Sequence, residues 1–73
     1  MSNLDPNLIK IRDANLGLIR HNRFGRAILQ AKDYLLYILG EDKMEQVDRE
    51  VDDFVAHMKS IYEEALCNRS TNA

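Results

Sequence analysis

The most regular hydrophobic pattern lies in the C-terminal half of the chain. Between Lys43 and Leu66, apolar residues recur at alternating intervals of three and four, at Met44, Val47, Val51, Phe54, Met58, Ile61 and Ala65. That spacing places them on one face of an α-helix. Val55, Tyr62 and Leu66 widen this face to that of a core-packing helix. Asp42 followed by Glu45 has the spacing of a capping box, so the pattern predicts a helix over residues 42–67.

A second helix is predicted over residues 23–39. One face of it carries Phe24, Ile28, Ala31, Leu35 and Ile38. Gly40 suits the position after the last turn, because glycine takes the positive φ that ends many helices. Only two or three residues then separate the two helices, so we expect them to fold back on each other as an antiparallel helical hairpin.

The first 22 residues allow two interpretations. Asp5 and Pro6 form an N-cap and first-turn pair that favours a helix. Ile9 to Arg12 instead alternates apolar and charged residues, and Leu16 to Ile19 could return as a second strand after a turn near Asn15. The predicted fold class is therefore mainly α, with an N-terminal arm that is either a short β-hairpin, which we favour slightly, or a third helix.

A chain of 73 residues forms one small domain, which we place at residues 1–67, with a polar, flexible tail at 68–73. The longest apolar run, Tyr34 to Leu39, is too short to span a bilayer. The N-terminus lacks the features of a secretory signal, and the single cysteine, Cys67, allows no disulfide framework. We therefore expect a cytoplasmic protein with no membrane partner.

Catalytic chemistry is not indicated by these residues. His21 and His57 are 36 positions apart, and no cysteine–histidine spacing suits zinc. His57 and Cys67 lie about 15 Å apart along one predicted helix, too far for a nucleophile and its base. There is also no glycine-rich phosphate loop. The sequence predicts a protein that is not an enzyme, with no catalytic residue, cofactor or metal.

Charge is divided unevenly along the chain. Residues 1–40 carry six basic and three acidic residues, for a net +3, whereas residues 41–73 carry four and nine, for a net −5. The basic candidates for partner binding are Lys10, Arg12, Arg20, Arg23 and Arg26, and the acidic candidates are Asp48, Asp52 and Asp53. Internal pairing or solvation is the common fate of such groups, and docking to a protein is the alternative. In a helical hairpin the two groups should lie at opposite ends, as two separate docking surfaces.

Tyr34 and Tyr37 with Leu36 add more apolar surface to the second predicted helix than one neighbouring helix can cover. Residues 8–19 could pack there, or a second copy of the chain could. This surface keeps a homodimer open as a further partner.

In its short length, single domain, helical character and mixed charge, the chain resembles small phage-encoded proteins that bind and redirect host RNA polymerase. The resemblance implies a non-enzymatic regulator that binds a larger protein target, the bacterial transcription machinery, and inhibits or redirects it. No motif carries the resemblance, so it assigns no residue. Two alternatives stay open: a nucleic-acid-binding module using Arg20 to Arg26, which a sequence pI of about 5.6 disfavours, and a structural dimerisation module.

Overall fold

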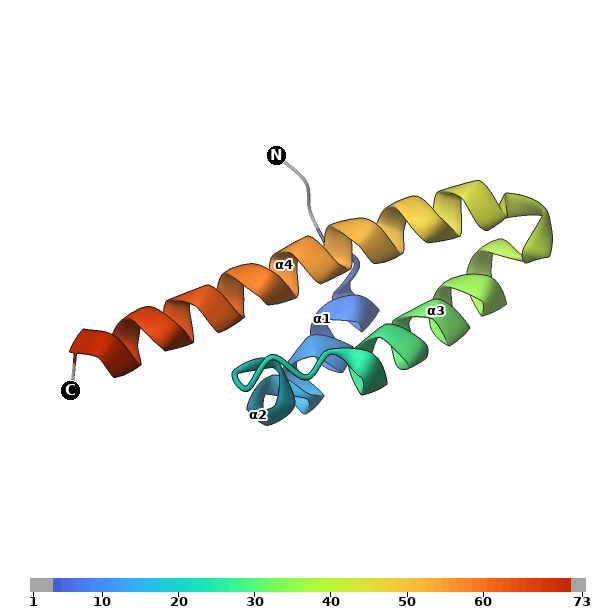
Figure 1. Ribbon diagram of the computed structural model, residues 1–73. Coiled ribbons are helices and arrows are strands. Elements are labelled where there is room, and N and C mark those ends of the chain that lie inside the picture. The colour runs from blue at the N-terminus through green and yellow to red at the C-terminus, as the bar shows by residue number, and fades with distance from the viewer. Residues whose placement is uncertain (1–3, 72–73) are drawn as a thin grey trace.

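The computed structural model describes residues 4–71, with side chains up to residue 69. Its helices are α1 (Pro6–Ala14), α2 (Leu16–Ile19), α3 (Gly25–Leu39) and α4 (Met44–Thr71), with a short 3₁₀ helix, η1 (Glu41–Lys43), between the last two (Figure 1). The described residues contain no strand. The prediction of a mainly α fold is confirmed.

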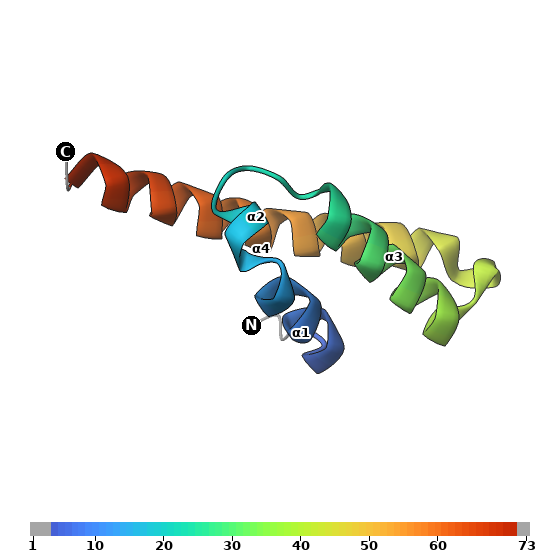
Figure 2. The same cartoon turned by 90° about the horizontal axis from the view of Figure 1, so that it is seen from below.

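Helix α4 is the longest element; α2 and α3 pack against it, and α1 packs mainly against α3. The 28 residues of α4 span about 42 Å, most of the 48 Å length of the molecule, and α1, α2 and α3 all lie along one side of it (Figures 1 and 2). The helix continues through residues 68–71, which the sequence assigned to a flexible tail. The rest of that predicted tail, residues 72–73, lies outside the described residues.

Helices α3 and α4 pack in a hairpin-like arrangement. Gly40 ends α3 with φ of 87°, and its N–H donates to the Leu36 carbonyl oxygen at 2.9 Å. An L side chain at this φ would be strained, which explains why glycine occupies the turn. The turn brings the apolar stripe of α4 against the small side chains of Ala27 and Ala31. The fully buried core is Leu8, Ile19, Ala27, Ala31, Leu35, Val47, Phe54 and Met58.

The β-hairpin alternative for the N-terminal arm is wrong. Asp5 caps α1 by accepting from the Asn7 N–H at 2.8 Å, as the Asp5–Pro6 pair predicted. Ile9 and Ile11, which alternate with charged residues in the sequence, lie on helix α1 and not in a strand. Ile11 packs against the core, and Ile9 lines a groove beside α4. Tertiary packing therefore overrides the local β-like alternation.

Buried Asn15 marks the break between α1 and α2. Its side chain is only 4% exposed, and its Nδ2 donates to the Ile11 carbonyl oxygen at 2.7 Å and to Gln30 Oε1 at 2.9 Å. The first bond satisfies one of the last carbonyls of α1, which have no partner within the helix. The second ties the bend to α3. Asn15 therefore fixes the angle at which the arm lies across the helical pair.

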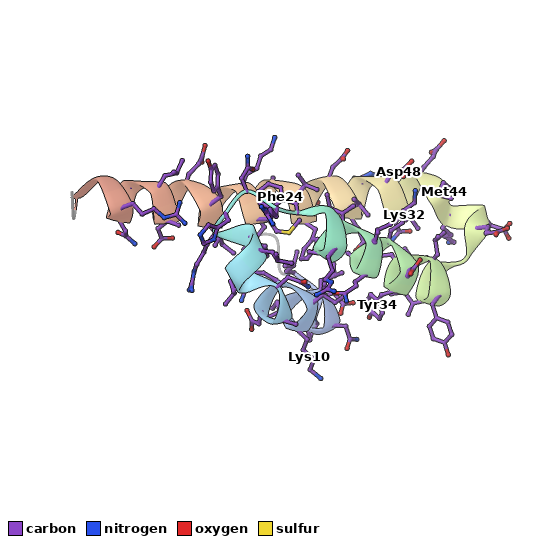
Figure 3. All side chains as sticks on the ribbon, turned by 60° about the horizontal axis from the view of Figure 1, so that its bottom comes forward. Lys10, Phe24, Lys32, Tyr34, Met44 and Asp48 are labelled. Atoms are coloured by element: carbon purple, nitrogen blue, oxygen red, sulfur yellow. The ribbon has the colours of Figure 1, made fainter. Side chains whose placement is uncertain are left out.

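Tyr34 joins the start of the arm to α3. Its hydroxyl donates to the Asp5 carboxylate at 3.1 Å and accepts from Asn7 Nδ2 at 2.8 Å (Figure 3). Asp5 and Asn7, which precede the residues 8–19 that were expected to pack there, thus contact Tyr34. They do not cover Tyr37, whose exposed fraction is 89%.

A reverse turn between α2 and α3 contains most of the segment Arg20 to Arg26. Asn22 has a φ of 62°, and the N–H groups of Arg23 and Asn22 donate to the carbonyl oxygens of Leu18 and Ile19 at 2.9 and 3.1 Å. These two bonds and the left-handed residue between them form a Schellman motif, in which asparagine takes the place that glycine usually occupies. The turn reverses the chain between the end of α2 and the start of α3.

Candidate functional site

Two adjoining grooves run between the N-terminal arm and α4. The first, of about 410 Å³, contains the carboxylates of Asp5, Glu50 and Asp53, and we call it the acidic groove. The second, of about 520 Å³, contains the guanidinium groups of Arg20 and Arg69, and we call it the arginine groove. Arg12 lines both grooves and separates them.

Arg12 and His57 form the partition between the two grooves. Arg12 Nη1 lies 2.8 Å from His57 Nε2, and its Nε and Nη2 donate to Asp13 Oδ1 at 3.1 and 3.0 Å. A guanidinium can only donate, so His57 accepts through Nε2 and carries its proton on Nδ1. The Arg12 side chain is 24% exposed. It is therefore held between α1 and α4 and does not extend freely into solvent.

The acidic groove has an apolar floor and a charged rim. Leu4, Leu8 and Ile9 provide apolar lining from the arm, and Leu8 is fully buried. On the α4 side, Glu50 and Asp53 are three residues apart and therefore share one face of the helix. Such a groove suits a segment that combines an apolar side chain with basic ones.

The arginine groove continues along the same side of α4. It is lined there by Ile61, Glu64, Ala65, Asn68 and Arg69. Arg69 Nη2 donates to the Arg20 carbonyl oxygen at 2.7 Å, so the last turns of α4 are tied to the end of α2. From Glu50 to Arg69 the two grooves extend over 19 residues of α4, or about 28 Å. This length is comparable to that of an ordinary helical recognition segment.

The charged groups of the grooves are mostly unpaired within the molecule. Among the residues that the structure describes, Arg12 and Asp13 form the only ion pair, at 3.0 Å. No described carboxylate therefore lies within ion-pair distance of Arg20, Arg23 or Arg26, and none of the described basic groups pairs with Asp48, Asp52 or Asp53. These charges are available to a partner.

The five basic residues singled out from the sequence do not form one surface. Arg12 is held in the partition, Arg20 lines the arginine groove, and Arg23 lines a separate hollow with Gly17, Leu18 and His21. Lys10 points away from the other helices on the exposed side of α1 (Figure 3). Arg26 is exposed on α3 and lines none of these hollows. Arg20 and Arg23, which are three residues apart, therefore line different hollows.

The three acidic candidates are also divided. Asp53 lines the acidic groove, whereas Asp48 and Asp52 do not. Asp53 lies about 140° around the α4 axis from Asp48 and 100° from Asp52. Figure 3 shows Asp48 on the side of α4 that faces α3 and Lys32. Only Asp53 therefore shares a surface with Glu50 and Asp5.

Sequence reasoning did not identify His57, Glu64 or Arg69 as candidates for partner binding. His57 and Glu64 carry a signal in retrospect, since with Asp53 and Asn68 they fall at helical spacing beside the apolar stripe of α4. What the sequence could not show is that the arm is helical and lies along this side. Without the arm, the same residues belong to an ordinary solvated face.

The comparisons with known proteins found no significant match. No protein-family model matches the chain, and neither a curated protein nor a solved structure shows significant similarity to it. Within residues 4–71, no helix combines the length and the apolar character needed to cross a bilayer. Interpretation of function therefore rests on the grooves and their charges.

Proposed function

We propose that this protein is a small non-enzymatic regulator that binds a larger protein through the two grooves along α4. The bacterial transcription machinery, RNA polymerase in particular, is the target that the resemblance implies and the first to test. On this proposal the partner contributes a segment with basic side chains for the acidic groove and acidic ones for the arginine groove.

The observation that carries the proposal is that two adjoining grooves differ in charge and that most of their charged groups form no ion pair among the described residues. Three carboxylates and Arg12 line the first, and three arginines with Asp13 and Glu64 line the second. Charge of both signs, aligned along about 28 Å of one helix, favours a partner segment in one orientation and penalises the reverse. Leu4, Leu8 and Ile9 add apolar contact area at one end. Interfaces of this kind combine an apolar centre with a polar rim.

Nucleic-acid binding is supported less well by the same geometry. A nucleic-acid site needs several basic groups along one surface to follow the phosphates. Here three arginines line one groove, but Asp13 and Glu64 line it with them, and three carboxylates line the adjoining groove. A dipolar protein segment fits this distribution better than a uniformly negative backbone.

Two pairs of neighbouring acids provide matched variants for the test. Asp53 and Glu64 line the grooves, and the adjacent Asp52 and Glu63 are exposed and line neither. Binding of the full chain to purified bacterial RNA polymerase would be measured by biolayer interferometry. We expect Asp53→Lys, in the acidic groove, to weaken binding about tenfold or more, and Glu64→Lys, which makes the arginine groove more positive, to strengthen it. Asp52→Lys and Glu63→Lys should change binding less than about twofold.

Two results would contradict the proposal. Absence of binding at micromolar polymerase would remove RNA polymerase as the target, and capture from a bacterial lysate would then test for another protein. Equal effects of the groove variants and their neighbours would remove the grooves as the binding site. Helical content measured by circular dichroism would show that all four variants remain folded.

A further inference from the structure

The side of α3 opposite the core is uncovered and carries large apolar groups. Leu29 is 66% exposed and Tyr37 is 89% exposed. Leu29 and Asp33 stand two residues on either side of buried Ala31, which places both about 160° away from it around the helix. In both ribbon views no element covers the side of α3 turned away from α4 (Figures 1 and 2). We define the outer face of α3 as Arg26, Leu29, Asp33 and Tyr37.

The charges on the outer face are arranged antisymmetrically about Leu29. Arg26 precedes it by three residues and Asp33 follows it by four, and both are exposed. The two are about 10.5 Å apart along the axis, one positive and one negative. Neither forms an ion pair with another described residue. A helix face with this order of charges is complementary to itself when a second copy runs antiparallel.

We propose that the outer face of α3 is a self-association surface whose partner is a second copy of this chain. A twofold axis between residues 29 and 30 places Arg26 of each copy opposite Asp33 of the other and brings the two Leu29 side chains together at the centre. This is an isologous contact, in which the same patch serves on both sides.

Tyr37 extends the contact beyond the charge pairs. With the axis between residues 29 and 30, Tyr37 lies beyond the first turn of α3 in the other copy, against the turn that precedes Gly25. Large exposure of a tyrosine beside two unpaired charges and a leucine is the composition expected at the core and rim of a small interface.

The chemistry of the face favours a protein copy over the other occupants. Asp33 stands in the middle of the apolar positions, which disfavours a membrane surface with anionic lipids. The arm contacts the neighbouring side of α3 through Tyr34 and Gln30, so it cannot also cover this side. Because one 15-residue helix forms the surface, the dimer is expected to be weak and transient.

Sedimentation velocity of the full chain, at concentrations from about 20 µM to about 1 mM, tests this proposal. We expect the average mass to rise from monomer to dimer over that range. Arg26→Asp and Asp33→Arg should each weaken the dimer about tenfold, because each sets like charges against one another twice. The double variant should return the dissociation constant to within about threefold of the wild type, because both pairs are then reversed.

Leu66→Asp is the matched control for Leu29→Asp. Leu66 is also exposed, at 40%, and lies on α4, away from the outer face of α3. Only Leu29→Asp should abolish the dimer. A chain that stays monomeric up to about 1 mM, or a dimer that the double variant does not restore, would overturn the proposal. This outcome is independent of the groove, since neither Arg26 nor Asp33 lines it.

Discussion

Replacement of Asn15 by alanine tests whether this residue fixes the arm to the rest of the molecule. The substitution removes the two hydrogen bonds that Asn15 Nδ2 donates, to the Ile11 carbonyl oxygen and to Gln30 Oε1. Each such bond contributes about 1 kcal/mol net, so Asn15→Ala should lower the free energy of unfolding by about 2 kcal/mol. A domain of this size has only a few kcal/mol of stability, so the loss is large.

The contribution of each bond can be separated with Gln30. This side chain is exposed, so its Oε1 can bind water once Asn15 is gone. Gln30→Ala should therefore cost about 1 kcal/mol and leave the bond to Ile11 in place. The double variant should cost about 2 kcal/mol rather than 3, because both single variants remove the same bond.

Asn15→Asp places a titratable group at the same site, so the stability of this variant should depend on pH. The new carboxylate would face the Ile11 carbonyl oxygen, which cannot donate, and this raises the pKa of Asp at position 15 in the folded state. Stability is then retained below the pKa of an unfolded aspartate, near 4, and lost as pH rises through the higher folded pKa. At pH 7 this variant should be less stable than Asn15→Ala.

The assay is urea unfolding followed by circular dichroism at 222 nm, with the three single variants and the Asn15–Gln30 double compared at constant m-value. A loss below about 0.5 kcal/mol for Asn15→Ala would refute the assignment of Asn15 as the fixing residue. Full additivity of Asn15→Ala and Gln30→Ala would refute the bond between them.

Three further outcomes follow from the packing and the turns, and urea unfolding measures each of them. His57→Ala should lower the free energy of unfolding by less than about 1 kcal/mol, because the contact of His57 with Arg12 is exposed. His57→Gln keeps an acceptor and should lower it less. Equal losses for the two variants would contradict a role for the acceptor. A Cβ meets no other atom at Gly40 or at Gly17, so only the backbone angle distinguishes them. Gly40→Ala should lower the free energy of unfolding by about 1 kcal/mol because of its positive φ, whereas Gly17→Ala should raise it by up to about 0.5 kcal/mol. Two losses of the same size would contradict this account. Met58→Ala should cost about 3 kcal/mol by leaving a cavity among fully buried residues, and a loss under about 1 kcal/mol would place Met58 outside the core.

Local signals in the sequence predicted a large part of this fold. The apolar stripe of α4, the Asp5 cap and the Gly40 stop each depend on residues within one or two turns of one another, and each is found in the structure. The form of the arm could not be predicted in the same way. It depends on bonds such as Asn15 to Gln30 and Tyr34 to Asp5, which join residues 15 and 29 positions apart.

The candidate site was less predictable than the fold, for a related reason. The charges in the segment Arg20 to Arg26 were expected to act together, but the chain reverses at Asn22, and Arg20 and Arg23 line different hollows. Conversely, Arg12 of α1 and Asp53 of α4 are far apart in the sequence, and they line one groove only because the fold brings these two helices together. Linear charge runs predict a shared surface only when the backbone through them is straight.

The short turn at Gly40 has a consequence for the order in which the molecule folds and opens. Helices α3 and α4 meet after closing a loop of four residues, whereas the arm must bring Arg12 to His57 across 45 positions. Loop closure of the first kind is entropically cheaper and faster, so the helical pair should form early and the arm should join it late. By the same reasoning the arm should detach first in the native state, and its amide protons should exchange with solvent ahead of those in α3. One wall of both grooves is the arm itself, so the grooves exist only during the fraction of time that the arm is docked.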